Sequence, residues 1–106
     1  MTVGTFSNMK AVALIRRRLV LAADAFAEIA VWQLPKPLPP SRHQFKYRLA
    51  YVVAGRCVLR YDNELGKGDH RHAGTVEAPY TFSGPEQLMT DFNADIARWN
   101  DENSNA

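Results

Sequence analysis

An alternating run of residues in the middle of the chain places the strongest constraint on the fold. Successive side chains of a β-strand point to opposite faces, and from His43 to Val53 one face carries only large apolar and aromatic residues: Phe45, Tyr47, Leu49, Tyr51 and Val53. Ala54-Gly55 then separates this run from a second extended segment, Arg56 to Tyr61. A two-residue connection that ends in glycine, which tolerates positive φ, is typical of a tight β-hairpin. The sequence therefore predicts two antiparallel strands that meet at Gly55.

The flanking segments predict further strands. Phe26 to Leu34 is rich in β-branched and aromatic residues, which predicts a strand. Ala11 to Leu21 taken alone fits either a helix or a strand. Because a predicted strand follows it closely, we interpret the two segments as a hairpin. Pro35 to Ser41 contains four prolines, which lack amide donors, so we expect a connection there. Thr75 to Phe82 predicts a short strand that Pro79 restricts to a sheet edge.

A helix is predicted after the strands. Ser83 and Glu86 have the spacing of a capping box, and Pro85 is tolerated in a first helical turn. An apolar stripe with helical spacing follows, formed by Leu88, Met89, Phe92, Ile96 and Trp99. The remaining side chains are expected to face water, among them Asp91, Asp95 and Arg98. The predicted fold class is α+β, with an antiparallel sheet of four to five strands and a C-terminal helix packed on one face.

Composition fits one small domain. The chain has 106 residues, 46% of them hydrophobic, which is enough for one modest core. Its net charge of +2 permits an anionic partner without requiring one. The single cysteine, Cys57, excludes an intrachain disulfide, fits a reducing cytoplasm and is expected in the core. No apolar run approaches the roughly 20 residues of a membrane span. We predict a disordered leader over residues 1–8, one domain over 9–100 and a frayed tail over 101–106.

The segment from Arg60 to His72 concentrates reactive side chains. It holds three acids, three bases, two histidines and two glycines. His70 and His72 are two residues apart, which places both on the same face of an extended strand. Such a pair can transfer protons near neutral pH, or it can bind a metal if Asp62 or Glu64 comes close. The plain alternative is a pair of exposed loop histidines.

The neighbouring bases in this segment point to an anionic ligand. Lys67 stands between Gly66 and Gly68 and can help to bind an anion, although a simple turn with a solvated lysine explains the same residues. Arg60 can grip a phosphate or pair with Asp62. The sequence leaves each of these alternatives open.

A basic face with aromatic residues is predicted beside the charged segment. A hairpin about Gly55 places Arg48 near Arg60 or Tyr61, and Lys46 lies on the same strand as Arg48. Arg16-Arg17-Arg18 can extend this face, although Arg17 must point away from the other two. Such a composition is typical of surfaces that bind single-stranded nucleic acid, with Tyr61 available to stack on a base. Trp32 and Trp99 are assigned to the core.

Several sequence blocks together resemble the TumE family of prokaryotic toxin-antitoxin toxins. These blocks are Phe45-Lys46-Tyr47-Arg48-Leu49, Val58-Leu59-Arg60-Tyr61-Asp62-Asn63-Glu64, Gly66-Lys67-Gly68-Asp69-His70-Arg71-His72 and Pro79-Tyr80 with Phe82, Leu88 and Asp91-Phe92. The resemblance runs from Met9 to Trp99. It implies a small cytoplasmic toxin that is neutralised by a partner antitoxin with a helix-turn-helix DNA-binding domain.

A toxin with this basic face and two histidines is expected to be a metal-independent endoribonuclease that needs no cofactor. The expected proton-transfer pair is His70 and His72, with Asp62 or Asp69 orienting a histidine. The expected RNA contacts are Lys46, Arg48, Arg60, Tyr61, Lys67 and Arg71. The main alternative is a non-catalytic module that binds nucleic acid or protein through the same face, and a metal-dependent nuclease is a third. RNA and the antitoxin are the expected partners, a homodimer stays open, and no membrane contact is expected.

Overall fold

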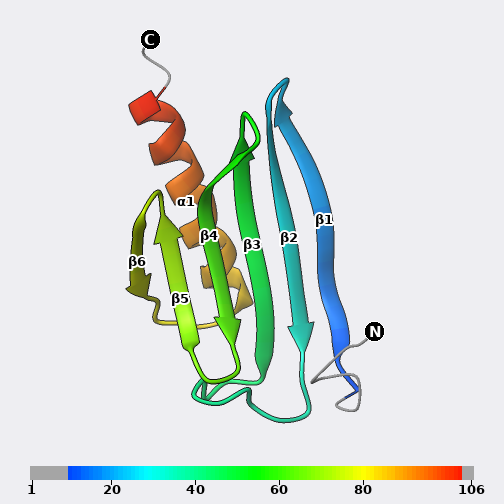
Figure 1. The fold of residues 1–106 in the computed structure, drawn as a ribbon. Coiled ribbons are helices and arrows are strands. Elements are labelled where there is room, and N and C mark those ends of the chain that lie inside the picture. The colour runs from blue at the N-terminus through cyan, green and yellow to red at the C-terminus, as the bar shows by residue number, and fades with distance from the viewer. Residues whose placement is uncertain (1–9, 104–106) are drawn as a thin grey trace.

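The computed structural model describes residues 10–103 and shows one sheet packed against one helix (Figure 1). Within these residues six strands pair antiparallel in chain order, one more than the four to five expected. The elements are β1 (Val12–Ala22), β2 (Ala25–Gln33), β3 (Phe45–Val53), β4 (Arg56–Glu64), β5 (Gly68–Ala73), β6 (Val76–Pro79) and α1 (Pro85–Asn103). The predicted α+β class and the C-terminal helix are therefore confirmed.

The missed strand is β5, which lies inside the charged segment. Residues 65–67 form a turn between β4 and β5. A strand that carries polar side chains on both faces shows no alternation of apolar and polar residues, so the pattern that reveals β3 cannot reveal β5. The charged segment is thus a hairpin rather than a loop.

The predicted hairpin at Gly55 is confirmed, but its register differs. Ala54 and Gly55 both have positive φ, at 50° and 78°, as a tight hairpin turn requires. A bulge between Tyr51 and Val52 then shifts the pairing of β3 with β4 by one residue. Arg48 consequently pairs with Asp62, not with Arg60 or Tyr61 as expected.

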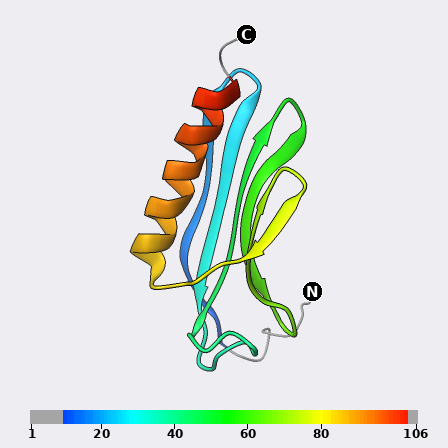
Figure 2. The ribbon, with the colours of Figure 1, turned by 90° about the vertical axis from the view of Figure 1, so that its left-hand side faces the viewer.

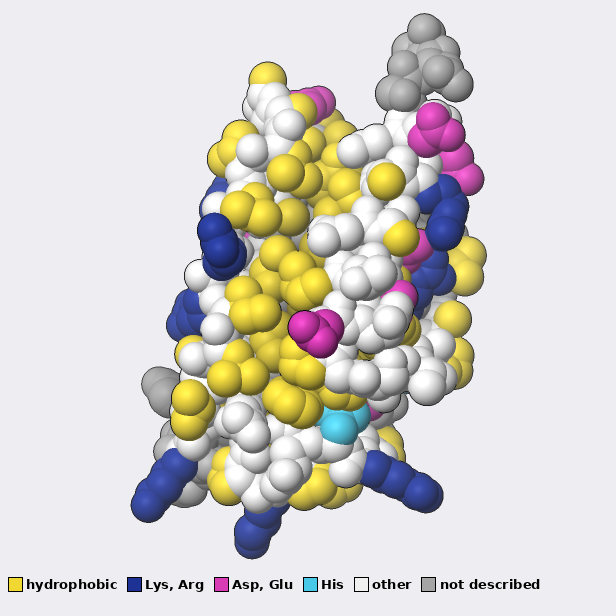
Figure 3. Space-filling view, turned by 180° about the vertical axis from the view of Figure 1, so that it is seen from behind, with side chains coloured by type: hydrophobic (Ala, Val, Ile, Leu, Met, Phe, Trp, Pro, Cys, Tyr) yellow, Lys and Arg dark blue, Asp and Glu magenta, His cyan; other side chains and the backbone are white. Residues whose placement is uncertain are grey.

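The helix α1 covers one side of the sheet (Figure 2). Its predicted apolar stripe is confirmed, because Leu88 and Phe92 are fully buried and the other three members pack against the core as partly buried residues. Figure 3, which views this side, shows a band of apolar side chains on the sheet beside the helix. We call this side of the sheet the helix face and the opposite side the open face. The core residues of the sheet lie on the helix face: Ala25, Ala27, Ile29, Val31, Tyr47, Leu49, Tyr51, Leu59 and Tyr61.

Three burial predictions are wrong. Asp95, expected in water, is only 6% exposed, because it is spaced three residues from Phe92 and seven from Leu88 and so lies in the buried stripe. Cys57 is exposed near the end of the β3–β4 hairpin. Trp32 is half-buried and lies outside the core, on the open face.

The described domain extends beyond the predicted C-terminal limit at residue 100. The helix continues to Asn103, so residues 101–103 of the predicted tail belong to α1. The predicted leader and residues 104–106 lie outside the described residues. No helix within residues 10–103 is long and apolar enough to cross a bilayer.

Candidate functional site

The hairpin of β4 and β5 divides the charged segment between the two faces of the sheet. Register places side chains from each strand in rows across the open face. One row is Arg16, Ala30, Arg48, Asp62, His70 and Pro79, and the next is Arg18, Glu28, Ala50, Arg60, His72 and Glu77. The pleat turns the intervening residues of the hairpin, among them Tyr61 and Arg71, toward the helix. The prediction that His70 and His72 share a face is confirmed.

The two histidines converge on one carboxylate from the edge strand β6. Glu77 Oε2 lies 3.4 Å from His70 Nδ1 and 3.3 Å from His72 Nε2. Both histidine side chains are about three-quarters buried, at 23% and 26% exposure, whereas Glu77 is 44% exposed. Sequence reasoning missed Glu77, although the expected edge strand from Thr75 to Phe82 contains it. Pairing that strand with the histidine segment would have brought the three side chains together.

Hydrogen bonds give the two imidazoles different roles. A guanidinium has donors only, so the 3.0 Å contact from Arg60 Nη2 makes His72 Nε2 an acceptor and places the proton of neutral His72 on Nδ1. His70 is the reverse, because its Nε2 donates to the Lys67 carbonyl at 2.5 Å. In neutral His70 the lone pair is therefore on Nδ1, the atom that faces Glu77. The site holds two imidazoles with opposite tautomers.

Two polar atoms of this cluster are buried without a hydrogen-bond partner. These atoms are Arg60 Nε and His70 Nδ1. Within residues 10–103, no other buried side-chain nitrogen or oxygen atom lacks a hydrogen-bond partner. Asp62 Oδ2 lies 3.5 Å from Arg60 Nε, close enough for an ion pair but too distant to satisfy the donor. Buried polar groups are almost always hydrogen-bonded, and exceptions are often functional. Both exceptions here belong to the predicted site.

On the helix face, Tyr61 and Arg71 form a closed network with the helix. Asp95 accepts hydrogen bonds from Tyr61 Oη and from Arg71 Nε, the latter at 2.6 Å, and Arg98 Nη1 lies 2.7 Å from the same carboxylate. Burial and the hydrogen bond to Asp95 raise the pKa of Tyr61. Burial alone would raise the pKa of Asp95, but the bonds from Arg71 and Tyr61 hold it below its usual value. The expectation that Tyr61 stacks on a base is wrong, because its side chain is only 2% exposed.

Asp69 contacts His43 and not His70 or His72, which it was expected to orient. Its carboxylate accepts a hydrogen bond from Tyr47 Oη at 2.7 Å, contacts His43 Nε2 at 2.7 Å and also bonds Ser41. Burial, followed by the hydrogen bond to Asp69, raises the pKa of Tyr47. Asp69 therefore ties β5 to the proline-rich connection and does not orient His70 or His72.

The remaining predicted residues lie around the histidine cluster. Lys67 is exposed in the turn between β4 and β5. Lys46 Nζ donates to the Asn63 carbonyl, and burial lowers the pKa of Lys46. Arg48 lies on the open face, where it lines a groove of about 400 Å³ together with Arg16 and Trp32. The structure thus brings together His70, His72, Arg60 and Asp62, with Arg48 next to Asp62.

The open face has no metal-binding constellation of the usual kind. Within residues 10–103 there is no group of three or more His, Cys, Asp or Glu side chains arranged to hold a metal ion. The chemistry that this cluster offers directly is proton transfer by two imidazoles and charge stabilisation by Arg60.

Comparison with known proteins gives one match. The model of the family described as "Toxin TumE" matches residues 5–100, nearly the whole chain. No curated protein and no solved structure matches. The resemblance inferred from the sequence blocks is confirmed.

Proposed function

The chain belongs to the TumE family of toxins, and from this we propose that it arrests growth as a metal-independent endoribonuclease whose site is the histidine cluster on the open face. The observation that carries the proposal is the pair of unpartnered buried atoms, Arg60 Nε and His70 Nδ1. One is a donor suited to a phosphate oxygen, and the other is a lone pair suited to accepting a proton. A ribonucleotide bound over β4 and β5 would satisfy both, with a phosphate oxygen accepting from Arg60 Nε and the 2′-hydroxyl donating to His70 Nδ1.

Each residue of the cluster has a role in this reaction. His70 Nδ1 removes the proton from a ribose 2′-hydroxyl, and the resulting oxygen attacks the adjacent phosphorus. The bond from phosphorus to the 5′-oxygen breaks, and His72, which enters the step as an imidazolium protonated on both ring nitrogens, donates a proton to this leaving oxygen and becomes neutral. Arg60 stabilises the additional negative charge on the phosphate. The products are a 2′,3′-cyclic phosphate and a free 5′-hydroxyl, so atoms and charge balance without an added reactant.

Glu77 positions both imidazoles. Its carboxylate lies within 3.4 Å of one nitrogen of each ring, so it is placed to stabilise whichever histidine carries the additional proton. After cleavage His70 holds that proton and His72 has lost one. A carboxylate next to both rings can help the proton to pass from His70 back to His72, which restores the starting protonation state of each histidine before the next turnover.

The proposal is tested by RNA cleavage in the presence of EDTA. Wild-type protein is expected to cut single-stranded RNA and to leave cyclic phosphate ends, and His70→Ala and His72→Ala to lower the rate by about 10²- to 10⁴-fold. The matched control is His43→Asn, since His43 is the third histidine of the chain and lies in the Asp69 network. This variant should lose stability but keep its activity per folded molecule. Full activity of both site variants would refute the assignment.

A toxin of this kind requires an inhibitor. We propose that a partner antitoxin with a helix-turn-helix domain neutralises the chain, and that the histidine cluster is inactive in the complex. Co-expression with the product of the adjacent gene should restore growth. If wild-type protein binds RNA in EDTA but no RNA is cut, the open face is a non-catalytic binding surface instead.

A further inference from the structure

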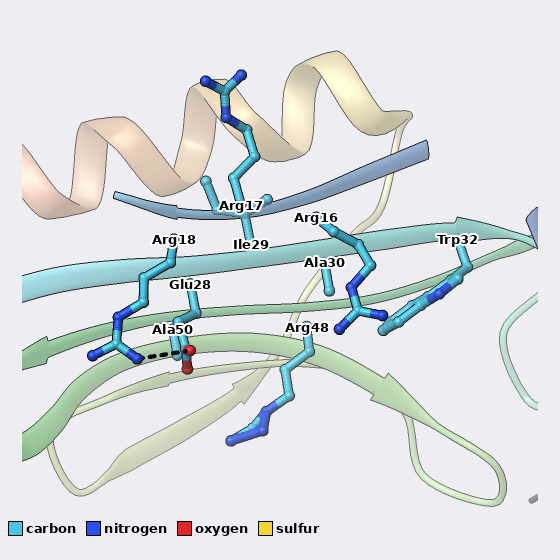
Figure 4. Close-up of a pocket in the computed structure, with 9 residues that line it drawn as sticks. All are labelled: Arg16, Arg17, Arg18, Glu28, Ile29, Ala30, Trp32, Arg48 and Ala50. Carbon is cyan, nitrogen blue, oxygen red and sulfur yellow. Dashed lines mark ion pairs between the residues drawn. The ribbon is translucent and has the colours of Figure 1, made fainter. Parts of the chain in front are cut away.

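A second feature of the open face lies at the other end of the sheet, across β1, β2 and β3. It is a groove of about 400 Å³, and the residues that matter for its chemistry are Arg16, Arg18, Arg48, Trp32, Ala30 and Ala50 (Figure 4). We propose that this groove binds the single-stranded part of an RNA substrate, with phosphates on the arginines and an unstacked base against Trp32. The inference rests on the proposed function and names the form of its substrate.

The charges of the groove favour a polyanion. Of the four arginines around the groove, Arg16, Arg18 and Arg48 point to the open face, where the one acid is Glu28. The ion pair of Glu28 with Arg18 spans 3.5 Å between side chains that are both more than half exposed. An ion pair as exposed as this is weak and readily exchanges for a phosphate. Arg48 has no carboxylate within ion-pair distance among residues 10–103. Its guanidinium is therefore available to a ligand.

The shape of the groove leaves room for a flat ring. Register places Ala30 directly between Arg16 and Arg48, and Ala50 beside Glu28 in the next row. Since neighbouring strands lie about 4.8 Å apart, the two arginines flank a floor of small side chains about 10 Å wide. Figure 4 shows the Arg16 guanidinium beside the Trp32 ring, and the two are separated by 6.0 Å from Cζ to ring centroid.

An aromatic ring flanked by guanidiniums favours nucleic acid over an acidic peptide. Phosphates bind arginine, and a base stacks on an indole without regard to sequence. An acidic side chain would use the arginines and leave the indole unused. A duplex is disfavoured as well, because its bases are stacked inside and cannot reach a ring on the protein surface.

The groove is continuous with the histidine cluster. Arg16 and Arg48 stand in the same row as Asp62 and His70. Two strand spacings, about 10 Å, separate Arg48 from His70. A single strand that lies along this row would place one phosphate at Arg48 and a later one at Arg60 and His70. Binding and cleavage would then involve different parts of one surface.

Binding is tested with a short fluorescent 2′-O-methyl oligoribonucleotide, which lacks the nucleophile and cannot be cut. Arg48→Ala should weaken binding and reduce the slope of log K against log salt by about 0.7, the value for one phosphate contact on a single strand. Trp32→Leu should weaken binding about tenfold and leave that slope unchanged, because stacking releases no counterions. The matched control is Arg17→Ala. Arg17 and Ile29 are among the residues around the groove, but the Arg17 side chain points to the helix face (Figure 4), so its loss should change neither quantity.

A second measurement reports the groove directly through the fluorescence of Trp32. The chain has two tryptophans, and Trp99→Phe leaves Trp32 as the only one. The oligonucleotide should quench the fluorescence of this protein. Ala30→Glu, which places an acid on the groove floor, should abolish the quenching.

The outcomes separate this inference from the proposed function. If the groove variants bind the oligonucleotide as wild type does while wild type still cuts RNA, the groove inference fails and the ribonuclease stands. If the groove variants lose binding but wild type cuts no RNA, the groove binds RNA and the ribonuclease proposal fails. Binding of fluorescently labelled poly-glutamate and not of the oligonucleotide would identify the groove as a site for an acidic protein and overturn the inference.

Discussion

The two faces of the β4–β5 hairpin use similar residue types for opposite purposes. On the helix face, the half-buried Arg71 pairs with the buried Asp95 and contacts Tyr61, and Arg71 Nε, the Asp95 carboxylate and the Tyr61 hydroxyl all have partners within hydrogen-bond distance. On the open face, Arg60 and His70 each keep a buried nitrogen without one. The first arrangement is complete without a ligand, whereas the second would be completed by the RNA substrate that we propose. Charge alone therefore does not distinguish the two sets of residues. They differ in whether their buried polar atoms already have hydrogen-bond partners within the protein.

The comparison predicts that changes on the helix face affect folding and that changes on the open face affect activity. The largest effect is expected for Asp95→Ala. This change leaves Arg71 next to the core without its carboxylate and removes the acceptor of Tyr61, so the free energy of unfolding should fall by about 3 kcal/mol. Urea denaturation measures it. Asp101→Ala, at an exposed site on the same helix, is the control and should stay within about 0.5 kcal/mol of wild type. Equal stability of the two variants would contradict this view of the helix face.

A somewhat smaller loss is expected at Asn63, which is completely buried. Its amide accepts the backbone N–H of Tyr47 at 3.0 Å and donates to the Phe45 carbonyl at 2.8 Å. Asn63→Ala leaves both backbone groups without these bonds, which should cost about 2 kcal/mol. Asn93→Ala, on the exposed side of α1, is the matched control in the same denaturation experiment. A loss below that of the control would show that the backbone groups find other partners.

On the open face, Glu77→Gln should lower kcat for RNA cleavage about tenfold, with KM unchanged, because it removes the charge that both histidines share. The ion pairs are partly exposed and contribute little to folding, so stability should change by less than about 0.5 kcal/mol. Glu77→Asp keeps the charge and should recover part of the rate. A loss of stability without a loss of kcat would place Glu77 among the structural residues.

Acid should weaken the network on the helix face. The folded pKa of Asp95 is held below its unfolded value of about 3.9. Its contribution to stability is therefore complete above that value and is lost as the pH falls through the folded pKa. Urea denaturation between pH 7 and pH 3 should show a shallower decline for Asp95→Asn than for wild type. Parallel curves would mean that Asp95 titrates alike in the folded and unfolded chains.

Local patterns predicted most of the fold. The alternation in β3, the turn at Gly55, the proline-rich connection and the apolar stripe of α1 each depend on neighbours in the sequence, and each was found where expected. β5 was missed because it is polar on both faces. The register of Arg48 was missed because a bulge depends on packing between strands rather than on either strand alone.

The candidate site was predicted less completely. The pairing of His70 with His72 followed from spacing, but Tyr61, Asp69 and Arg71 were grouped with them because they are near in sequence. The partners that separate these residues, Asp95 and Tyr47, come from other elements. The sequence did not indicate that Glu77 and Trp32 belong to this face. Their positions became clear only when β6 was paired with β5 and β2 with β3.

The sequence by itself determined which residues share a side, since the alternation of a strand is fixed by its backbone. His70 and His72 had to lie together, and Asp69 and Arg71 had to lie opposite. Only the tertiary structure decided which side the helix would cover. Because Leu88 and Phe92 pack against one side of the sheet, Asp95 lies beside Arg71 on that side. The two histidines lie on the face that α1 does not cover.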